Sequence, residues 1–102
     1  MPEKQKPKVE FSRNGGLVGS VCVSLAGHDA ASVLIVVGEG DGCVLVADGK
    51  RRLIKAPKAK KTKHISIISK LSAEACEMIS NGKANDSMLR REISSVTRGI
   101  LS

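Results

Sequence analysis

The most constraining feature of the sequence is a series of short β-type segments. They are separated by turns and follow one another about every ten residues. SVCVSL at 20–25 alternates apolar with small polar side chains, and SVLIVVG at 32–38 is a continuous apolar run rich in β-branched residues. CVLVA at 43–47 and KRRLIK at 50–55 are the next two segments. Short runs of this composition, bounded by glycine, predict strands. Their even spacing is typical of a small barrel or sandwich rather than of a βαβ unit.

Turn-forming residues separate the segments. EGDG at 39–42 is a tight turn, and Asp48-Gly49 is a strong two-residue hairpin signal. Glycine tolerates the positive φ that such turns require. The glycines expected to shape the turns are Gly27, Gly42 and Gly49.

The fourth predicted strand ends at a proline. Pro57 ends the fourth strand, because proline cannot donate to a ladder. HISII at 64–68 is apolar enough to form a fifth strand. A fifth strand that closes the sheet hides the edges that four strands leave open. The sequence therefore predicts a mainly β fold, built on a small five-stranded β-barrel.

A first helical pattern follows the sheet. Ser72 is placed to cap a helix over 73–81, and Gly82 to end it. The apolar side of this helix holds Leu71, Ala75, Ile79 and Cys76. We expect this side to pack on the barrel or on the second helix.

A second helix is predicted over 87–98. Asn85 or Asp86 caps its start, and Gly99 stops it. Its apolar stripe consists of Leu89, Ile93, Val96 and Ile100. The stripe is expected to pack within the chain, and the alternative is a helix that binds a partner protein.

Residues 1–18 mix Lys, Glu and Pro with a Gly-Gly pair, which predicts a flexible arm. The alternative is a basic arm that adds a few phosphate contacts. The predicted organisation is a flexible N-terminal arm at 1–18, a barrel at 19–68 and a two-helix C-terminal extension at 72–102.

The positive charge of the chain is concentrated in one segment. The net charge is +7, whereas residues 50–71 alone carry +9 and no acidic residue. A basic loop that only keeps a protein soluble is the alternative, but acids usually intersperse such surfaces. This concentration is instead what contact with a polyanion requires. The residues expected to make the contact are Lys50, Arg51, Arg52, Lys55, Lys58, Lys60, Lys61 and Lys63, with a smaller share for His28.

The sequence contains no catalytic constellation. His28 and Asp29 are adjacent, which does not by itself make a triad. Gly38, Gly40 and Gly42 give G-x-G-x-G, but a strand follows instead of a helix, so a hairpin explains them better than a phosphate loop. We expect no enzyme activity, no cofactor, no metal and no small-molecule substrate.

Cysteine usage points to a reducing compartment. Cys22, Cys43 and Cys76 are far apart and odd in number, so they predict reduced thiols in a cytoplasmic protein. No apolar run approaches the ~18 residues of a membrane span. The first ten residues contain no apolar core of a secretory signal, so neither secretion nor membrane contact is expected.

Four ordered features in residues 19–66 resemble a known family. A strand of the type G-x-V-x-x-S lies at 19–24, and a turn on Ala-Gly with a polar pair follows at 26–29. A strand ends in Val-Val-Gly at 36–38, and VLVADG at 44–49 runs into basic residues and a Pro-Lys stretch. The set resembles the KOW-motif family of RNA-binding proteins. It is most similar to small bacterial proteins related to KOW-type large-subunit ribosomal proteins of archaea and eukaryotes.

This resemblance implies an SH3-like five-stranded β-barrel that binds structured RNA, usually ribosomal RNA. It also implies association with the ribosome and translation, with ribosomal proteins as further partners. The family turn usually reads G-R-D-x-G, whereas this turn reads GHDAA at 27–31, without that Arg and second Gly. The expected RNA contact therefore shifts to 50–63.

The scarcity of aromatic residues selects a mode of recognition. Proteins that read single strands stack bases on aromatic side chains, and Phe11 is the one aromatic residue of this chain. The sequence therefore predicts recognition of RNA backbone and shape. If about five cations meet phosphates, log K should fall with log salt at a slope of roughly −3.5 to −4.5.

Two other functions are compatible with the pattern. An SH3-like module could dock on a ribosomal or transcription protein through its apolar rim or its helices. Non-specific DNA association is the second. PKAKKTK at 57–63 also resembles a nuclear import signal, although such matches are frequent by chance.

Overall fold

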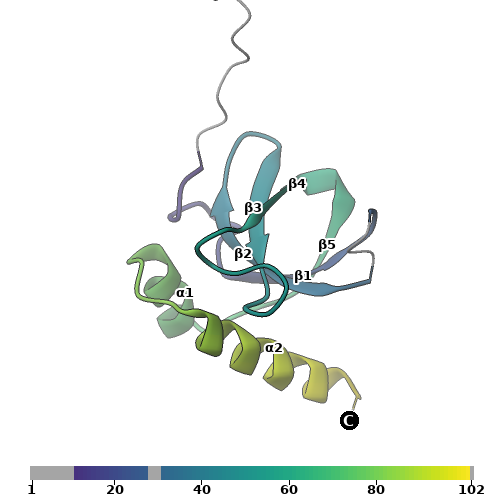
Figure 1. Ribbon diagram of the computed structural model, residues 1–102, viewed down its shortest axis with the longest axis vertical. Coiled ribbons are helices and arrows are strands. Elements are labelled where there is room, and N and C mark those ends of the chain that lie inside the picture. Colours follow the sequence, from purple (N-terminus) through teal and green to yellow (C-terminus); the bar gives the residue numbers. More distant parts are fainter. Residues whose placement is uncertain (1–10, 28–30, 102) are drawn as a thin grey trace, which may run out of the picture.

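The computed structural model describes residues 11–27 and 31–101. Residues 1–10 of the arm expected at 1–18, and His28 of the predicted RNA contact, lie outside the described residues. Five strands form one antiparallel sheet, and two helices follow it (Figure 1). In chain order the elements are β1 (Ser20–Ser24), β2 (Val33–Glu39), β3 (Cys43–Ala47), β4 (Lys58–Lys61), the 3₁₀ turn η1 (Thr62–His64), β5 (Ile65–Lys70), α1 (Ala73–Ser80) and α2 (Asp86–Leu101).

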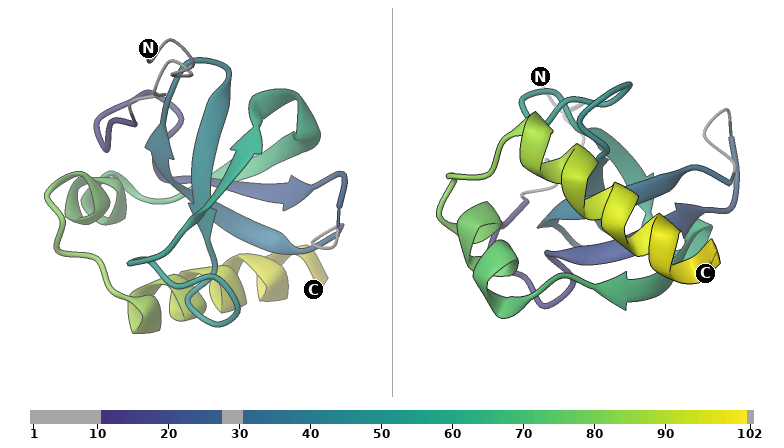
Figure 2. Two further views of the ribbon diagram at one scale, coloured as in Figure 1. Left: turned by 45° about the horizontal axis from the view of Figure 1, so that its top comes forward. Right: turned by 90° about the horizontal axis from the view of Figure 1, so that it is seen from below.

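The expected mainly β fold with five strands and two helices is confirmed, but the strand order is β4-β3-β2-β1-β5 and the sheet is not closed into a barrel, so the SH3-like barrel stays a prediction. The chain turns at η1 between β4 and β5, and these two strands do not pair with each other. The sheet is nevertheless strongly curled (Figure 2). The N–H of Leu25 at the end of β1 donates to the carbonyl oxygen of His64 over 2.8 Å, which ties β1 to the corner between the two edge strands.

Four of the five predicted strands are confirmed with small changes of their ends, but the strand expected at 50–55 is wrong. The fourth strand is β4, beyond Pro57. Oδ1 of Asp48 accepts hydrogen bonds from three successive peptide N–H groups, those of residues 50–52, at 2.8, 2.9 and 2.9 Å. These donors fold back on the aspartate, and the chain forms a loop instead of extending the sheet.

β1 is buried on both sides, which differs from the expected alternation. Ser20, Val21, Cys22 and Ser24 are buried and Val23 is half-buried, whereas Leu25, just beyond the strand, is 57 % exposed. A shift of register between Val21 and Cys22 interrupts the pairing of β1 with β5, and a bulge of this kind re-aims side chains. The buried hydroxyl of Ser24 donates to the carbonyl oxygen of Ala26 over 3.0 Å, so its burial leaves no unpaired polar group.

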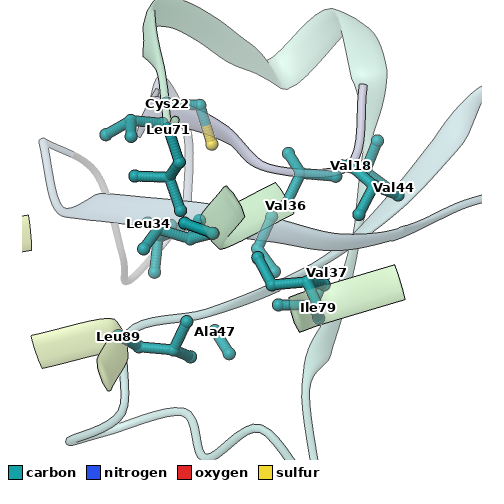
Figure 3. Close-up of a cluster of buried hydrophobic side chains, with 14 of the residues drawn as sticks. Val18, Cys22, Leu34, Val36, Val37, Val44, Ala47, Leu71, Ile79 and Leu89 are labelled. Carbon is teal, nitrogen blue, oxygen red and sulfur yellow. The ribbon is translucent and has the colours of Figure 1, made fainter. Parts of the chain in front are cut away.

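One hydrophobic core joins the sheet to both helices (Figure 3). Ile79 of α1 and Leu89 of α2 are buried in the same cluster as Val36 and Val44 of the sheet. The prediction that the helices pack within the chain is therefore confirmed. None of the described helices has the length and apolar character needed to span a membrane.

The predicted cap of α1 is confirmed, because Oγ of Ser72 accepts a hydrogen bond from the N–H of Ala75 over 3.1 Å. At α2, Oδ1 of Asn85 accepts from the N–H of Met88 over 2.8 Å. This helix continues through Gly99 to Leu101, so the expected stop is wrong. A single glycine in the last turn costs only about 1 kcal/mol and does not have to end a helix.

Residues 11–18 of the expected arm pack against the sheet. Ser12 forms a β-bridge with Glu39, and the N–H of Leu17 donates to Oε1 of Glu39 over 2.9 Å. Val18 is buried in the core. The folded part of the chain therefore begins before Gly19.

Candidate nucleic-acid interface

The structure divides the predicted basic segment into two surfaces. Residues 48–57 form the basic loop, which carries Lys50, Arg51, Arg52 and Lys55. Residues 58–64, which comprise β4 and η1, form the basic edge. The cations of the basic edge are Lys58, Lys60, Lys61 and Lys63.

The basic loop has an internal anchor. Besides the three hydrogen bonds to Asp48, the N–H groups of Asp48 and Gly49 both donate to the carbonyl oxygen of Arg52, at 2.9 and 3.0 Å. This closes a compact turn around one carboxylate oxygen. The backbone that carries Lys50 and Arg51 is therefore ordered before any ligand arrives.

The basic loop is also bound to α2 at both ends. The peptide N–H of Ile54 donates to Oδ1 of Asp86 over 2.7 Å, and Nη1 of Arg90 donates to the carbonyl oxygen of Gly49 over 2.6 Å. Gly49 has φ 78° and lies so close to the carbonyl of Asp86 that a Cβ atom would overlap it. The C-terminal helix thus acts as the support of the basic loop (Figure 2).

The side chains of the basic loop differ in exposure. Lys50, Arg51 and Lys55 are exposed, whereas Arg52 is half-buried. Arg51 can fork two N–H donors onto one phosphate, and lysine acts as a point charge. The exposed cations of this loop are the ones that a polyanion can reach directly.

The basic edge holds its lysines on paired backbone. Lys58, Lys60 and Lys61 lie opposite Val46, Val44 and Cys43 of β3. Lys58 and Lys60 share one side of the strand and are half-buried, whereas Lys61 and Lys63 are exposed. Lys61 and Lys63 are therefore the cations of the basic edge that a ligand reaches most directly.

Lys60 reaches across the sheet. Its Nζ donates to the carbonyl oxygen of Ala26 over 3.3 Å, although β4 and β1 are not neighbours in the strand order. Burial raises the pKa of the nearby Cys22 thiol from 9.0 to about 11, and the positive charge of Lys60 opposes part of that rise. Cys22 therefore stays a protonated thiol at neutral pH, which makes it a poor nucleophile.

The turn glycines adopt the expected backbone. Gly27, Gly42 and Gly49 have φ values of 82°, 72° and 78°. Gly27 adjoins the residues that the structure leaves undescribed, His28 among them, so the contribution of that turn to an RNA contact stays a prediction.

Arg90 is the site residue that sequence reasoning missed. It lies on α2 and lines a pocket together with Lys50 and Arg51. Residues 72–102 have no net charge, so counting charges gave no signal for it. The available signal was helical spacing. Four residues of α2 at positions i, i+3, i+4 and i+7 line the same pocket, namely Arg90, Ile93, Ser94 and Thr97.

Across residues 11–27 and 31–101, no group of three or more His, Cys, Asp or Glu side chains is arranged to hold a metal ion. The basic loop and the basic edge present fixed cations, which attract anions.

No protein-family model matches the chain, and no curated protein matches it. The resemblance to the KOW family therefore stays a prediction that depends on the quoted residues.

Proposed function

We propose that this chain is an RNA-binding protein that contacts the phosphate backbone of structured RNA, with ribosomal RNA as the expected class. In this proposal the curled sheet is an SH3-like fold of the KOW type. The protein associates with the ribosome in the cytoplasm and has no enzyme activity. Both the basic loop and the basic edge contact the RNA.

The observation that carries this proposal is the anchoring of the basic loop. Its backbone is bound to the Asp48 carboxylate and, through Ile54 and Gly49, to α2. Cations on such a loop bind without first paying the conformational entropy that a free basic tail would pay. The same cations on a flexible segment would bind more weakly for the same charge.

The mode of binding follows from what the chain lacks. It has no Tyr or Trp, and its single aromatic residue, Phe11, is half-buried before β1. Aromatic platforms for stacking several bases are absent from the sequence, which supports recognition of backbone and shape.

The proposal is tested by comparing two doubly substituted variants with equal changes of charge. Arg51→Glu with Lys61→Glu changes one exposed cation on each basic surface. Lys83→Glu with Arg91→Glu changes two exposed cations outside them. Filter binding to a folded ribosomal RNA fragment and to duplex DNA of equal length measures the effect.

We expect the first variant to bind RNA at least about tenfold more weakly and the second to bind nearly as the wild type, because only the first loses charge-assisted hydrogen bonds to phosphate. Equal losses in both variants, or no retention of RNA by the wild type, would refute the proposal. Tighter binding to DNA than to RNA would replace it with DNA association.

A second candidate function is a protein-interaction module, and the open edge of β5 favours it. Ile67 and Ile68 on this strand are 45 % and 39 % exposed, and an edge strand can accept a further strand from a partner. A partner bound there would be retained by the Arg51→Glu/Lys61→Glu variant, whereas RNA would be lost.

A further inference from the structure

A pocket lies between the basic loop, the start of β2 and α2. Its volume is about 580 Å³, within the range of about 300 to 1,000 Å³ that small-ligand pockets occupy. The pocket is open to solvent, and its wall combines cations, hydroxyl groups and aliphatic side chains. This combination of charge with aliphatic and hydroxyl groups is what a ligand larger than an inorganic anion requires.

The charges around the pocket favour an anion. Lys50, Arg51 and Arg90 line it, and Asp48 is the opposing acid. Oδ1 of Asp48 is already engaged by three peptide N–H groups. Arg90 is held in place by its hydrogen bond to the carbonyl oxygen of Gly49. The net positive charge of the pocket thus comes from the basic loop, which holds Lys50 and Arg51, and from α2, which holds Arg90.

The remaining wall suits a heterocycle and a sugar better than an anion alone. Val33 and Ile93 are half-buried aliphatic residues of this wall. Ser94 and Thr97 add hydroxyl groups, which both donate and accept hydrogen bonds. An inorganic anion would use only the cations and leave the aliphatic surface in water.

We propose that this pocket binds one unpaired ribonucleotide of a bound RNA. The phosphate lies among Lys50, Arg51 and Arg90, and the base covers the aliphatic surface of Val33 and Ile93. This inference rests on the proposed RNA binding and adds one site of nucleotide capture to a surface that otherwise contacts backbone. It predicts a preference for RNA with an extruded nucleotide, such as a bulge.

The first test uses the folded, isotope-labelled chain and small probes. Adenosine and uridine monophosphates are titrated by amide NMR, with inorganic phosphate as the reference probe. We expect saturable shifts at Lys50, Arg51, Ser94 and Thr97 with a dissociation constant of about 1 mM or lower for the nucleotides. Inorganic phosphate should bind several-fold more weakly, because it does not cover the aliphatic wall.

Two neighbouring serines provide a matched pair of variants. Ser94 lines the pocket, whereas Ser95, also exposed and on α2, does not. Ser94→Leu removes a hydroxyl group of the pocket wall and narrows the pocket, so it should weaken the nucleotide shifts severalfold, and Ser95→Leu should leave them unchanged. Leucine is a good helix former, so neither change threatens the helix. Equal shifts with inorganic phosphate, or the same result in both variants, would overturn the proposal.

The second test uses a paired RNA hairpin with and without a single-nucleotide bulge. We expect the wild type to bind the bulged hairpin about fivefold more tightly, and Ser94→Leu to lose this preference while it still binds the paired hairpin. Equal binding of both hairpins by the wild type would refute the nucleotide pocket and leave RNA binding intact. Binding of neither hairpin would refute the proposed function itself.

Discussion

The carboxylate of Asp86, the first residue of α2, accepts a hydrogen bond of 2.7 Å from the peptide N–H of Ile54, 32 positions earlier in the chain. The same carboxylate lies in the first turn of the helix, where a negative charge is favoured by the helix dipole. One side chain therefore begins the C-terminal helix and also fixes the end of the basic loop. This link makes the geometry of the cations of the basic loop depend on the C-terminal helix, although residues 72–102 carry no net charge.

The first prediction concerns this link. Asp86→Ala should lower the free energy of unfolding by about 1–3 kcal/mol, because it leaves the part-buried N–H of Ile54 without its acceptor. Asp86→Asn keeps an acceptor oxygen and should lose less. Urea unfolding measures both changes, and amide hydrogen exchange at Ile54 should speed up in the alanine variant. Equal stability and exchange in all three proteins would contradict the role of Asp86 as an anchor.

The second prediction compares two turn glycines with similar backbone angles. Gly42 has φ 72° and open space around its Cα, whereas at Gly49 a Cβ would overlap the carbonyl oxygen of Asp86. Gly42→Ala should lower the free energy of unfolding by about 1–2 kcal/mol, because a residue with a Cβ atom is strained in the left-handed conformation. Gly49→Ala should cost more, because the loop must also move away from α2. Urea unfolding of the two variants checks the order, and equal costs would show that the loop can shift freely.

Much of the fold follows from local pattern. The segments at 32–38 and 43–47 are strands because continuous apolar runs between glycines need burial on both faces. Ser72 caps α1 as expected, since a capping hydroxyl acts within one turn of the chain. Such features need no knowledge of distant residues.

The parts that could not be predicted depend on side chains that act at a distance. KRRLIK at 50–55 is a loop because Asp48 takes the peptide donors that a strand would have used. Arg90 reaches the carbonyl oxygen of Gly49 only because α2 is held on the core through the buried Leu89. Neither the strand propensity of a segment nor a count of its charges predicts these two effects, because both effects depend on the tertiary structure.

The third prediction concerns pH and Cys22. Its pKa is about 11 in the folded chain and 9.0 ordinarily, so the folded state holds the thiol proton more tightly. The free energy of unfolding should be unaffected by this group below pH 9, and it should fall as pH rises from 9 to 11, by about 2 kcal/mol at pH 10.5. Urea unfolding at pH 8 and 10.5, under reducing conditions, measures this fall.

Cys22→Val is the control for that experiment, since it keeps an apolar group in the core and removes the titrating thiol. The variant should lose less stability between the two pH values than the wild type does. The two proteins differ only at position 22, so the difference between their losses reports on the Cys22 thiol. The same loss in both proteins would show that the folded thiol does not hold its proton more tightly than the unfolded one.

The last prediction concerns the ionic strength at which the chain holds RNA. With about five phosphate contacts, log K against log salt should have a slope of roughly −3.5 to −4.5, and affinity should fall by roughly 10²- to 10³-fold between 50 and 200 mM salt. Arg51→Gln removes one exposed cation of the anchored basic loop and should make the slope shallower by about 0.7–0.9. Arg91→Gln removes an exposed cation of α2 that does not line the pocket, and it should leave the slope unchanged. Filter binding to one folded RNA at several salt concentrations gives all three slopes. A wild-type slope near zero would mean that the cations of the basic loop and basic edge release no counterions, and electrostatic contact with the backbone would then be refuted.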